Sequence, residues 1–304
     1  MGYLEHIASL AADVDICTVS VTVAPLTDDG QILAQRDGSA WHLPSGALEV
    51  GEDFTACAHR IAGNAGLAIR DLRSLGTVGA RVEDIGNGLR RYDLLTVLGA
   101  CVTGTADSDL QPVATADHML TMDPRCAMVL RGSPTPFFEA PMRSRPLQSE
   151  PYRRELRRLV GATTCLILPA VAAIILTASA AVVLVKSREH DVWMIPGGMI
   201  EFGEPPADAV VREAQEETGL EVAPQRLASC YSGTPFVVTY RSGDVVQIVS
   251  FPFVAQVRGG SLHAMDAGEI REVRAFAPGD LPRMHPHWRQ VLSDALAGRI
   301  GTVA

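Results

Sequence analysis

Apolar and polar positions along this chain form short apolar runs that turn residues interrupt. The runs Ala170–Leu176 and Ala181–Val185 have strand length and small residues between them, which predicts two buried strands joined by a turn. Thr234–Tyr240 and Val245–Val257 flank an Arg-Ser-Gly-Asp turn and predict a hairpin. Pro286–Leu296 predicts a closing helix. The pattern therefore predicts an α+β fold in which helices cover a sheet.

The stretch from Gly161 to Val185 carries no charge and is long enough to cross a bilayer. Pro169 interrupts it, and the small residues from Thr177 to Ala180 favour a turn over a continuous helix. We therefore predict a soluble protein with no membrane span.

The chain repeats itself. The segment from Trp41 to Glu52, WHLPSGALEVGE, recurs as WMIPGGMIEFGE from Trp193 to Glu204, at an offset of 152 residues. A weaker match relates residues 98–104 to residues 253–259. The repeat predicts one fold duplicated: a first domain over residues 1–132, a proline-rich linker over 133–151 and a second domain over 152–304.

Composition narrows the functional classes. The 304 residues are 47% hydrophobic and 20% charged, which is typical of a folded protein with ordinary cores. A formal charge of −9 makes the whole molecule a poor non-specific binder of nucleic acid, because phosphate contacts need clustered cations, so we expect no nucleic-acid partner. The six cysteines show no paired spacing, and the amino-terminal residues are not basic, so we expect reduced thiols and a cytoplasmic location.

Acidic residues gather on one predicted helix. Pro205 and Pro206 suit its first turn, and Gly219 suits its end. At roughly 100° per residue, the side chains of Glu213, Glu216 and Glu217 lie within one arc of this helix. Like charges on one face near the negative end of the helix dipole destabilise it, and a divalent cation would reverse both effects. Oxygen ligands from one rigid face favour Mg²⁺ or Mn²⁺.

The surrounding pattern resembles a known motif. Gly198, Glu204 and the run REAQEETGL from Arg212 to Leu220 match the Nudix box in residue type and spacing. The resemblance implies two tandem Nudix-like α/β/α sandwich domains, each with a mixed sheet and a loop–helix–loop box.

It also implies roles for the matching residues. Glu213, Glu216, Glu217 and the carbonyl of Gly197 would bind the metal or act as base, Arg212 would orient a glutamate, and Glu204 would brace the loop. An additional acid outside the box is expected at Glu269 or Glu272. The reaction implied is metal-dependent hydrolysis of a diphosphate.

The substrate is less specified. Pro235 follows Leu220 by 15 residues, where family members that cleave ADP-ribose tend to carry proline, which favours ADP-ribose or a nucleoside-diphosphate sugar. His285 and His287 are interpreted as a solvated helix start rather than as substrate contacts. The pattern assigns no substrate-binding residue.

The first half departs from the motif. Alignment on Gly66-Leu67 against Gly219-Leu220 places Arg60, Gly63 and Asn64 opposite Glu213, Glu216 and Glu217. This half is therefore interpreted as a degenerate Nudix-like domain. Its role stays open between covering the active site, shaping specificity, binding an effector and replacing the second subunit of a homodimer. Analogy between folds favours the last role, in which the chain would be an intramolecular pseudo-dimer or would form a homodimer.

Two alternatives remain open. In the first, the chain is a non-catalytic sensor that binds a nucleotide or metabolite; the complete carboxylate set argues against it. The second is isomerisation of a prenyl diphosphate, which calls for a cysteine and a glutamate on either side of the carbon skeleton. No such pair is evident in the sequence.

Overall fold

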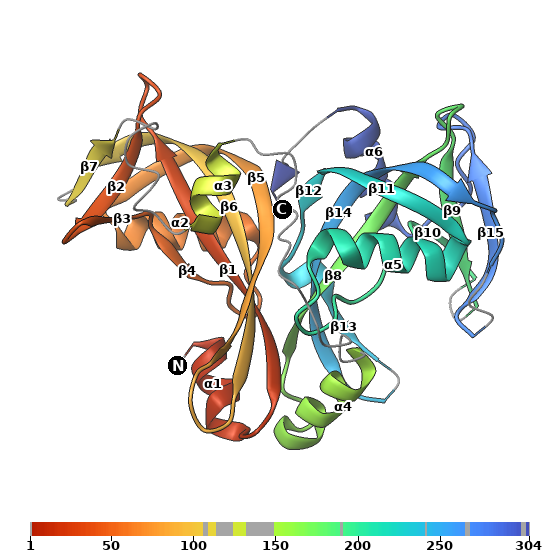
Figure 1. Ribbon diagram of the computed structural model, residues 1–304, viewed down its shortest axis with the longest axis horizontal. Helices are drawn as coiled ribbons and strands as arrows, with labels where there is room; N and C mark the ends of the chain where they lie inside the picture. Colours follow the sequence, from red (N-terminus) through yellow and green to blue (C-terminus); the bar gives the residue numbers. More distant parts are fainter. Residues whose placement is uncertain are drawn as a thin grey trace.

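The computed structural model describes residues 2–105, 109–113, 124–131, 149–188, 191–240, 242–264, 268–298 and 302–303. Within these ranges, the two halves of the chain each build a seven-stranded mixed sheet with helices on both faces, and the two sheets stand side by side (Figure 1). The predicted linker, residues 133–151, lies almost wholly outside the described residues. The predicted α+β class with two mixed sheets is confirmed.

The first sheet has the order β3-β2-β1-β6-β5, with β4 added beside β1 and β7 beside β2. Its central strands, β1 and β6, run parallel. Its elements are α1 (Tyr3–Leu10), β1 (Asp15–Leu26), β2 (Ile32–Asp37), β3 (Ala40–His42), β4 (Ser45–Ala47), α2 (Phe54–Asn64), β5 (Leu67–Asp84), β6 (Arg90–Thr105), β7 (Leu110–Val113) and α3 (Pro124–Leu130).

The second sheet repeats this order as β10-β9-β8-β14-β11, with β13 beside β14 and β15 beside β9. Here β8 and β14 are the parallel central pair. Its elements are α4 (Ser149–Val160), β8 (Leu166–Leu176), β9 (Val182–Ser187), β10 (Trp193–Met194), α5 (Pro206–Thr218), β11 (Leu220–Leu227), β12 (Ser229–Cys230), the short 3₁₀ helix η2 (Thr234–Phe236), β13 (Val237–Thr239), β14 (Val245–Gly260), β15 (Ile270–Phe276), α6 (Pro286–Leu296) and β16 (Thr302–Val303).

The uncharged run in the second half folds as predicted. It supplies β8 and β9, which pair antiparallel at Leu176 and Val182, and nearly every residue of both strands is buried. Burial on both faces explains the continuous apolar run, because a central strand between two helical layers has no solvent side. Among the described residues, no helix is both long and apolar enough to cross a membrane.

Helices cover opposite faces of each sheet. In the second sheet, Val210 and Ala214 of α5 pack in one apolar cluster, while Val291 and Leu292 of α6 pack in another. From Val171 to Leu176, successive β8 residues alternate between these clusters, as the pleat of a strand requires. The first sheet is arranged in the same way between α2 and α3. The predicted hairpin at β13–β14 and the closing helix are also confirmed.

The two halves share one apolar core. The cluster beneath α2 continues without a break into the cluster beneath α5, and the rings of Phe54 and Phe251 meet edge to face at 6.1 Å. Polar contacts across this boundary are reciprocal. Tyr92 of β6 donates to the carbonyl of Glu204 at 2.9 Å, and Gln247 of β14 donates to the carbonyl of Glu52 at 3.2 Å. Residues 52 and 204 are equivalent in the repeat, so the contacts approximate a two-fold relation.

Candidate active site

Helix α5 places the acidic side chains. It begins at Pro206, directly after a proline N-cap, and it ends at Gly219, whose φ of 70° is left-handed. Glycine suits that position because it lacks a Cβ, and its N–H closes the last turn by donating to the carbonyl of Gln215. The buried Val210 and Ala214 dock the helix on the sheet. The helix is thus fixed at both ends and along one face.

Arg212 forms the centre of the site. Its Nε and Nη2 donate to the two carboxylate oxygens of Glu204, each at 2.8 Å, and Nη2 also donates to the carbonyl of Met199 at 3.0 Å. The Glu204 side chain is only 5% exposed. Such a bidentate pair fixes both side chains geometrically. We call Arg212, Glu204 and the Met199 carbonyl the arginine bracket.

The remaining guanidinium nitrogen of the bracket reaches the helix carboxylates. Nη1 donates to Glu213 at 2.7 Å and to Glu216 at 3.1 Å. Glu217 is buried and accepts a hydrogen bond of 2.8 Å from the N–H of Gly197. The predicted residues are therefore brought together: one arginine links three of the glutamates, and the fourth binds the glycine loop.

Burial makes the charge on Glu213 unfavourable. Its side chain is 13% exposed, and loss of solvent raises the pKa of its carboxyl to about 7, although Arg212 acts in the opposite direction. The carboxylate lies so close to Gly198 that a Cβ there would approach it within 2.4 Å. Any larger residue at this position would therefore displace the Glu213 carboxylate.

A cavity of about 550 Å³ opens beside the bracket. It is lined by Glu204, Asp208, Val211, Arg212, Gln215 and Glu216. Three of these six residues are acidic and one is basic, so the cavity repels an anionic ligand unless cations neutralise it.

The donor set fits a hard divalent cation. Glu213, Glu216 and Glu217 offer carboxylate oxygens from one rigid helix, and the Gly197 loop lies against them. Burial raises the pKa of Glu213 even with Arg212 beside it, so added positive charge next to its carboxylate is stabilising. Within the part of the chain that the structure describes, no three acidic, histidine or cysteine side chains already converge on one point. The carboxylates instead turn toward Arg212 and the N–H of Gly197.

Comparison with known proteins gives concordant results. A family model described as the NUDIX domain matches residues 167–296. An ADP-ribose pyrophosphatase of Methanocaldococcus jannaschii is 31% identical over 137 residues, covering 44% of this chain and 76% of that protein. The chain belongs to the Nudix family.

Solved structures include a UDP-X diphosphatase, 22% identical with a TM-score of 0.37, covering 59% of this chain and 86% of that one. A Nudix hydrolase from Nitrosomonas europaea is 24% identical with a TM-score of 0.37, covering 44% of this chain and 91% of that one. On the family match, the chain is a Nudix hydrolase, and Nudix hydrolases generally use divalent metal ions.

Three residues singled out in the sequence lie outside the Nudix box. Glu269 is exposed just before β15, where its carbonyl accepts from the N–H of Arg188. Glu272 lies within β15 and pairs with Arg274. The role of either one as an additional acid stays a prediction. Pro235 lies in η2, next to Phe236 of an aromatic cluster.

The interpretation of His287 as a solvated residue is wrong. Its ring packs edge to face against Phe236 at 4.2 Å and against Tyr231 at 5.5 Å. Burial, with a smaller contribution from His285, lowers the pKa of the His287 imidazole to about 4. His285 is exposed as expected and caps α6 by accepting from the N–H of His287. Sequence reasoning missed the cluster because Phe236 of η2 and His287 of α6 are far apart along the chain, and no local pattern relates them.

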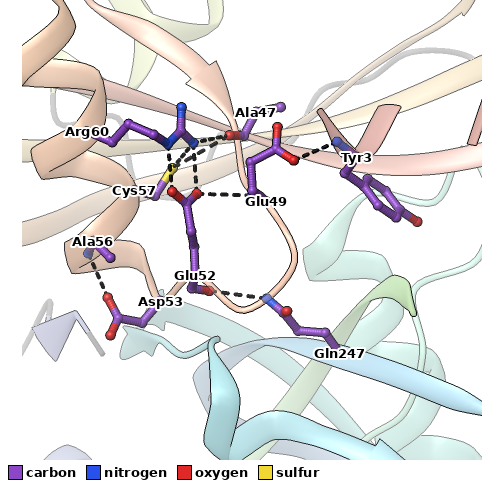
Figure 2. A network of polar contacts seen from close by, with 9 residues as sticks. All are labelled: Tyr3, Ala47, Glu49, Glu52, Asp53, Ala56, Cys57, Arg60 and Gln247. Carbon is purple, nitrogen blue, oxygen red and sulfur yellow. Dashed lines mark hydrogen bonds and ion pairs between the residues drawn. The ribbon is translucent and has the colours of Figure 1, made fainter. Parts of the chain in front are cut away.

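The first half preserves the arginine bracket. Arg60 donates through Nε and Nη2 to the two carboxylate oxygens of Glu52, at 2.6 and 2.8 Å, and Nη2 also reaches the carbonyl of Ala47 at 2.7 Å (Figure 2). Each atom pair repeats the contacts of Arg212 with Glu204 and Met199. Arg60 is therefore equivalent to Arg212.

The alignment of Arg60 with Glu213 is thus wrong by one residue. The missing residue of the repeat lies after Arg60, and the equivalents of Glu213, Glu216 and Glu217 are Ile61, Asn64 and Ala65. Ile61 is buried, and a Cβ on Gly46 would meet it at 3.2 Å, just as a Cβ on Gly198 would meet Glu213. The conclusion that this helix lacks acidic ligands is unchanged.

Proposed function

We propose that the second half hydrolyses a diphosphate linkage in a nucleoside-diphosphate-linked substrate, with Mg²⁺ or Mn²⁺ as cofactor. The observation that carries the proposal is the arginine bracket beside the acidic cavity, which fixes Glu213 and Glu216 where an anionic substrate could approach only with cations. The substrate class proposed is ADP-ribose or a nucleoside-diphosphate sugar. Pro235 and the name of the pyrophosphatase relative support it.

The proposed roles follow the positions of the side chains. Glu213, Glu216, Glu217 and the carbonyl of Gly197 would hold the cation, which when bound supplies charge neutralisation at the diphosphate and a lowered pKa of water. Arg212 orients Glu213 and Glu216, and Glu204 holds Arg212 in place. A deprotonated glutamate of this set accepts the proton of the attacking water.

We also propose that the chain divides into the domains predicted above and that the first domain takes the place of a second subunit. The reciprocal contacts of Tyr92 and Gln247, and the apolar core that crosses the boundary, support this arrangement. A pseudo-dimer of this kind needs no partner chain to complete the boundary.

The test is a panel of diphosphate compounds assayed with Mg²⁺, with Mn²⁺ and with EDTA. We expect release of two phosphorylated products from ADP-ribose or a nucleoside-diphosphate sugar, and no turnover after chelation. Turnover that EDTA leaves unchanged would overturn the metal-dependent mechanism. Nucleoside triphosphates cleaved much faster than ADP-ribose would overturn the substrate class. Binding of these compounds without any turnover would favour the sensor alternative.

A further inference from the structure

One side chain of the first half reaches the Nudix box of the second. Tyr92 is only 2% exposed, and its hydroxyl donates to the carbonyl of Glu204 at 2.9 Å across 112 positions of the chain. The neighbouring strand makes room for the hydroxyl, since a Cβ on Gly79 would lie 1.9 Å from it. A buried hydroxyl needs a hydrogen-bond partner, and here Glu204 supplies the acceptor while Gly79 leaves the space for the hydroxyl.

Tyr92 binds Glu204, and Glu204 contacts the proposed site through its own side chain. The carbonyl of Glu204 precedes the N-cap of α5, so it lies outside the hydrogen-bond ladder of that helix. The carboxylate of the same residue holds Arg212, which in turn binds Glu213 and Glu216. The hydroxyl thus fixes the backbone from which the arginine bracket is built.

Contacts to an aromatic ring hold the same loop. The Tyr92 ring meets the Phe202 ring edge to face at 6.1 Å, and the guanidinium of Arg90 lies 5.6 Å from the Phe202 ring centre. Arg90 is itself fixed by a bidentate pair with Asp15. The equivalent of Phe202 in the first half, Val50, is 45% exposed. Among the described residues, this packing of Tyr92 and Arg90 on an aromatic ring is therefore present over the Nudix box that keeps its carboxylates and absent at Val50.

The opposite contact provides a natural comparison. The carbonyl of Glu52 accepts from Ser232 at 3.1 Å and from Gln247 at 3.2 Å, both of the second half. This pair of donors braces a bracket whose helix carries Ile61, Asn64 and Ala65 in place of glutamates. The two braces are equivalent in position, and only one of them supports acidic side chains.

From this asymmetry we propose that Tyr92 is a positioning residue of the Nudix site, acting through the Glu204 carbonyl and Arg212 to align Glu213 and Glu216. The inference rests on the proposed function for its kinetic consequence. It gives the first half an indirect part in catalysis, through the position of Arg212, that a general stabilising role would not supply.

The test deletes one buried hydroxyl on each side of the boundary. Tyr92→Phe removes the donor to Glu204 and keeps the ring, whereas Ser232→Ala removes a donor to Glu52 and serves as the matched control. We expect kcat to fall about 10-fold in Tyr92→Phe, with KM changed less than about 2-fold, because alignment is lost and the substrate contacts are not. Ser232→Ala should keep the wild-type kcat, although both variants lose some thermal stability.

Two further measurements make the result decisive. Gly79→Ala, which displaces the hydroxyl without removing it, should lower kcat in the same way. Hydrogen–deuterium exchange should rise over residues 198–206 in Tyr92→Phe and stay at the wild-type rate there in Ser232→Ala. Equal kcat in Tyr92→Phe and wild type, or equal exchange over 198–206, would overturn the inference.

The exchange experiment also separates this inference from the proposed function. If the wild-type protein hydrolyses no diphosphate compound, the proposed function fails, and the exchange rates still decide whether Tyr92 orders the box loop. If the wild type is active and the two hydroxyl variants lose kcat equally, the proposed function stands and the positioning role fails.

Discussion

The two halves share a bracket and differ in what the bracket supports. In both, an arginine on the helix binds a glutamate and a backbone carbonyl of the preceding loop with nearly the same atoms. Beyond the bracket, the second half carries Glu213, where the first carries the buried Ile61. The bracket is thus a structural device of the loop–helix junction, separable from the acidic side chains that give the junction its proposed chemistry.

The difference also shows how the first half tolerates the loss. Ile61 fills with apolar contacts the place that a buried carboxylate occupies in the second half, and it packs under Gly46. A buried aliphatic side chain stabilises the fold, whereas a buried carboxylate needs a cation or a hydrogen-bond partner. The first half is therefore relieved of an electrostatic cost that the second half retains, in line with the role proposed for Glu213.

The largest expected effect on activity comes from removing a carboxylate of α5, compared with a change at the equivalent position of α2. Glu217→Gln or Glu216→Gln removes an anionic oxygen at constant volume, and each should lower kcat/KM at least roughly 100-fold if the cation supplies several kcal/mol to the transition state. Asn64→Ala, at the position equivalent to Glu216, is the matched control and should retain wild-type turnover. Activity near wild type in Glu217→Gln would contradict the proposed role of Glu217 as a metal ligand.

The next effect concerns the boundary between the halves. Residues 151–304 expressed alone should aggregate, self-associate or lose substrate affinity, because the shared core, including Phe251 and Phe202, would face solvent. Light scattering after size exclusion and an activity assay measure this. A monomeric fragment with full activity would contradict both the pseudo-dimer proposal and the role of Tyr92.

Matched changes in the two brackets should have different consequences. Arg212→Lys keeps the charge and loses the bidentate geometry, so we expect about a 10-fold fall in kcat as Glu213 and Glu216 lose their alignment. Arg60→Lys should lower the melting temperature and leave kcat unchanged. The pair is measured by steady-state kinetics and thermal unfolding, and equal kinetic losses in the two variants would erase the distinction drawn between the brackets.

The smallest effect contrasts two glycines. Gly198→Ala brings a methyl group within 2.4 Å of the Glu213 carboxylate, so the acid must move and activity should fall severalfold. Gly46→Ala meets an Ile61 carbon at 3.2 Å, which a small side-chain shift relieves. We expect this variant to show a change of less than about 1 kcal/mol in unfolding free energy and unchanged kinetics. A kinetic defect in Gly46→Ala would contradict this expectation and show that packing around Ile61 affects the site of the second half.

Local patterns predicted much of the fold. The buried strands β8 and β9, the β13–β14 hairpin and helix α6 follow from apolar runs, turn residues and a proline start, since each is specified by residues near one another in the chain. The repeat predicted two equivalent sheets for the same reason. The alignment within the repeated helix was wrong because it was anchored on Gly66 and Gly219, which mark the helix end and do not show where the missing residue lies. The contacts of Arg60 show that this residue is missing after position 60.

The sequence by itself determined the Nudix box: its glycines, its glutamates and their placement on one helix face depend on spacing alone. The tertiary structure decided which of those carboxylates the arginine holds, how far Glu213 is buried, that His287 lies among aromatic rings, and that Tyr92 binds the backbone of Glu204. These depend on packing between elements as much as 112 positions apart, where solvent exclusion sets the pKa and shape sets the partner. No periodicity in the chain encodes such distances.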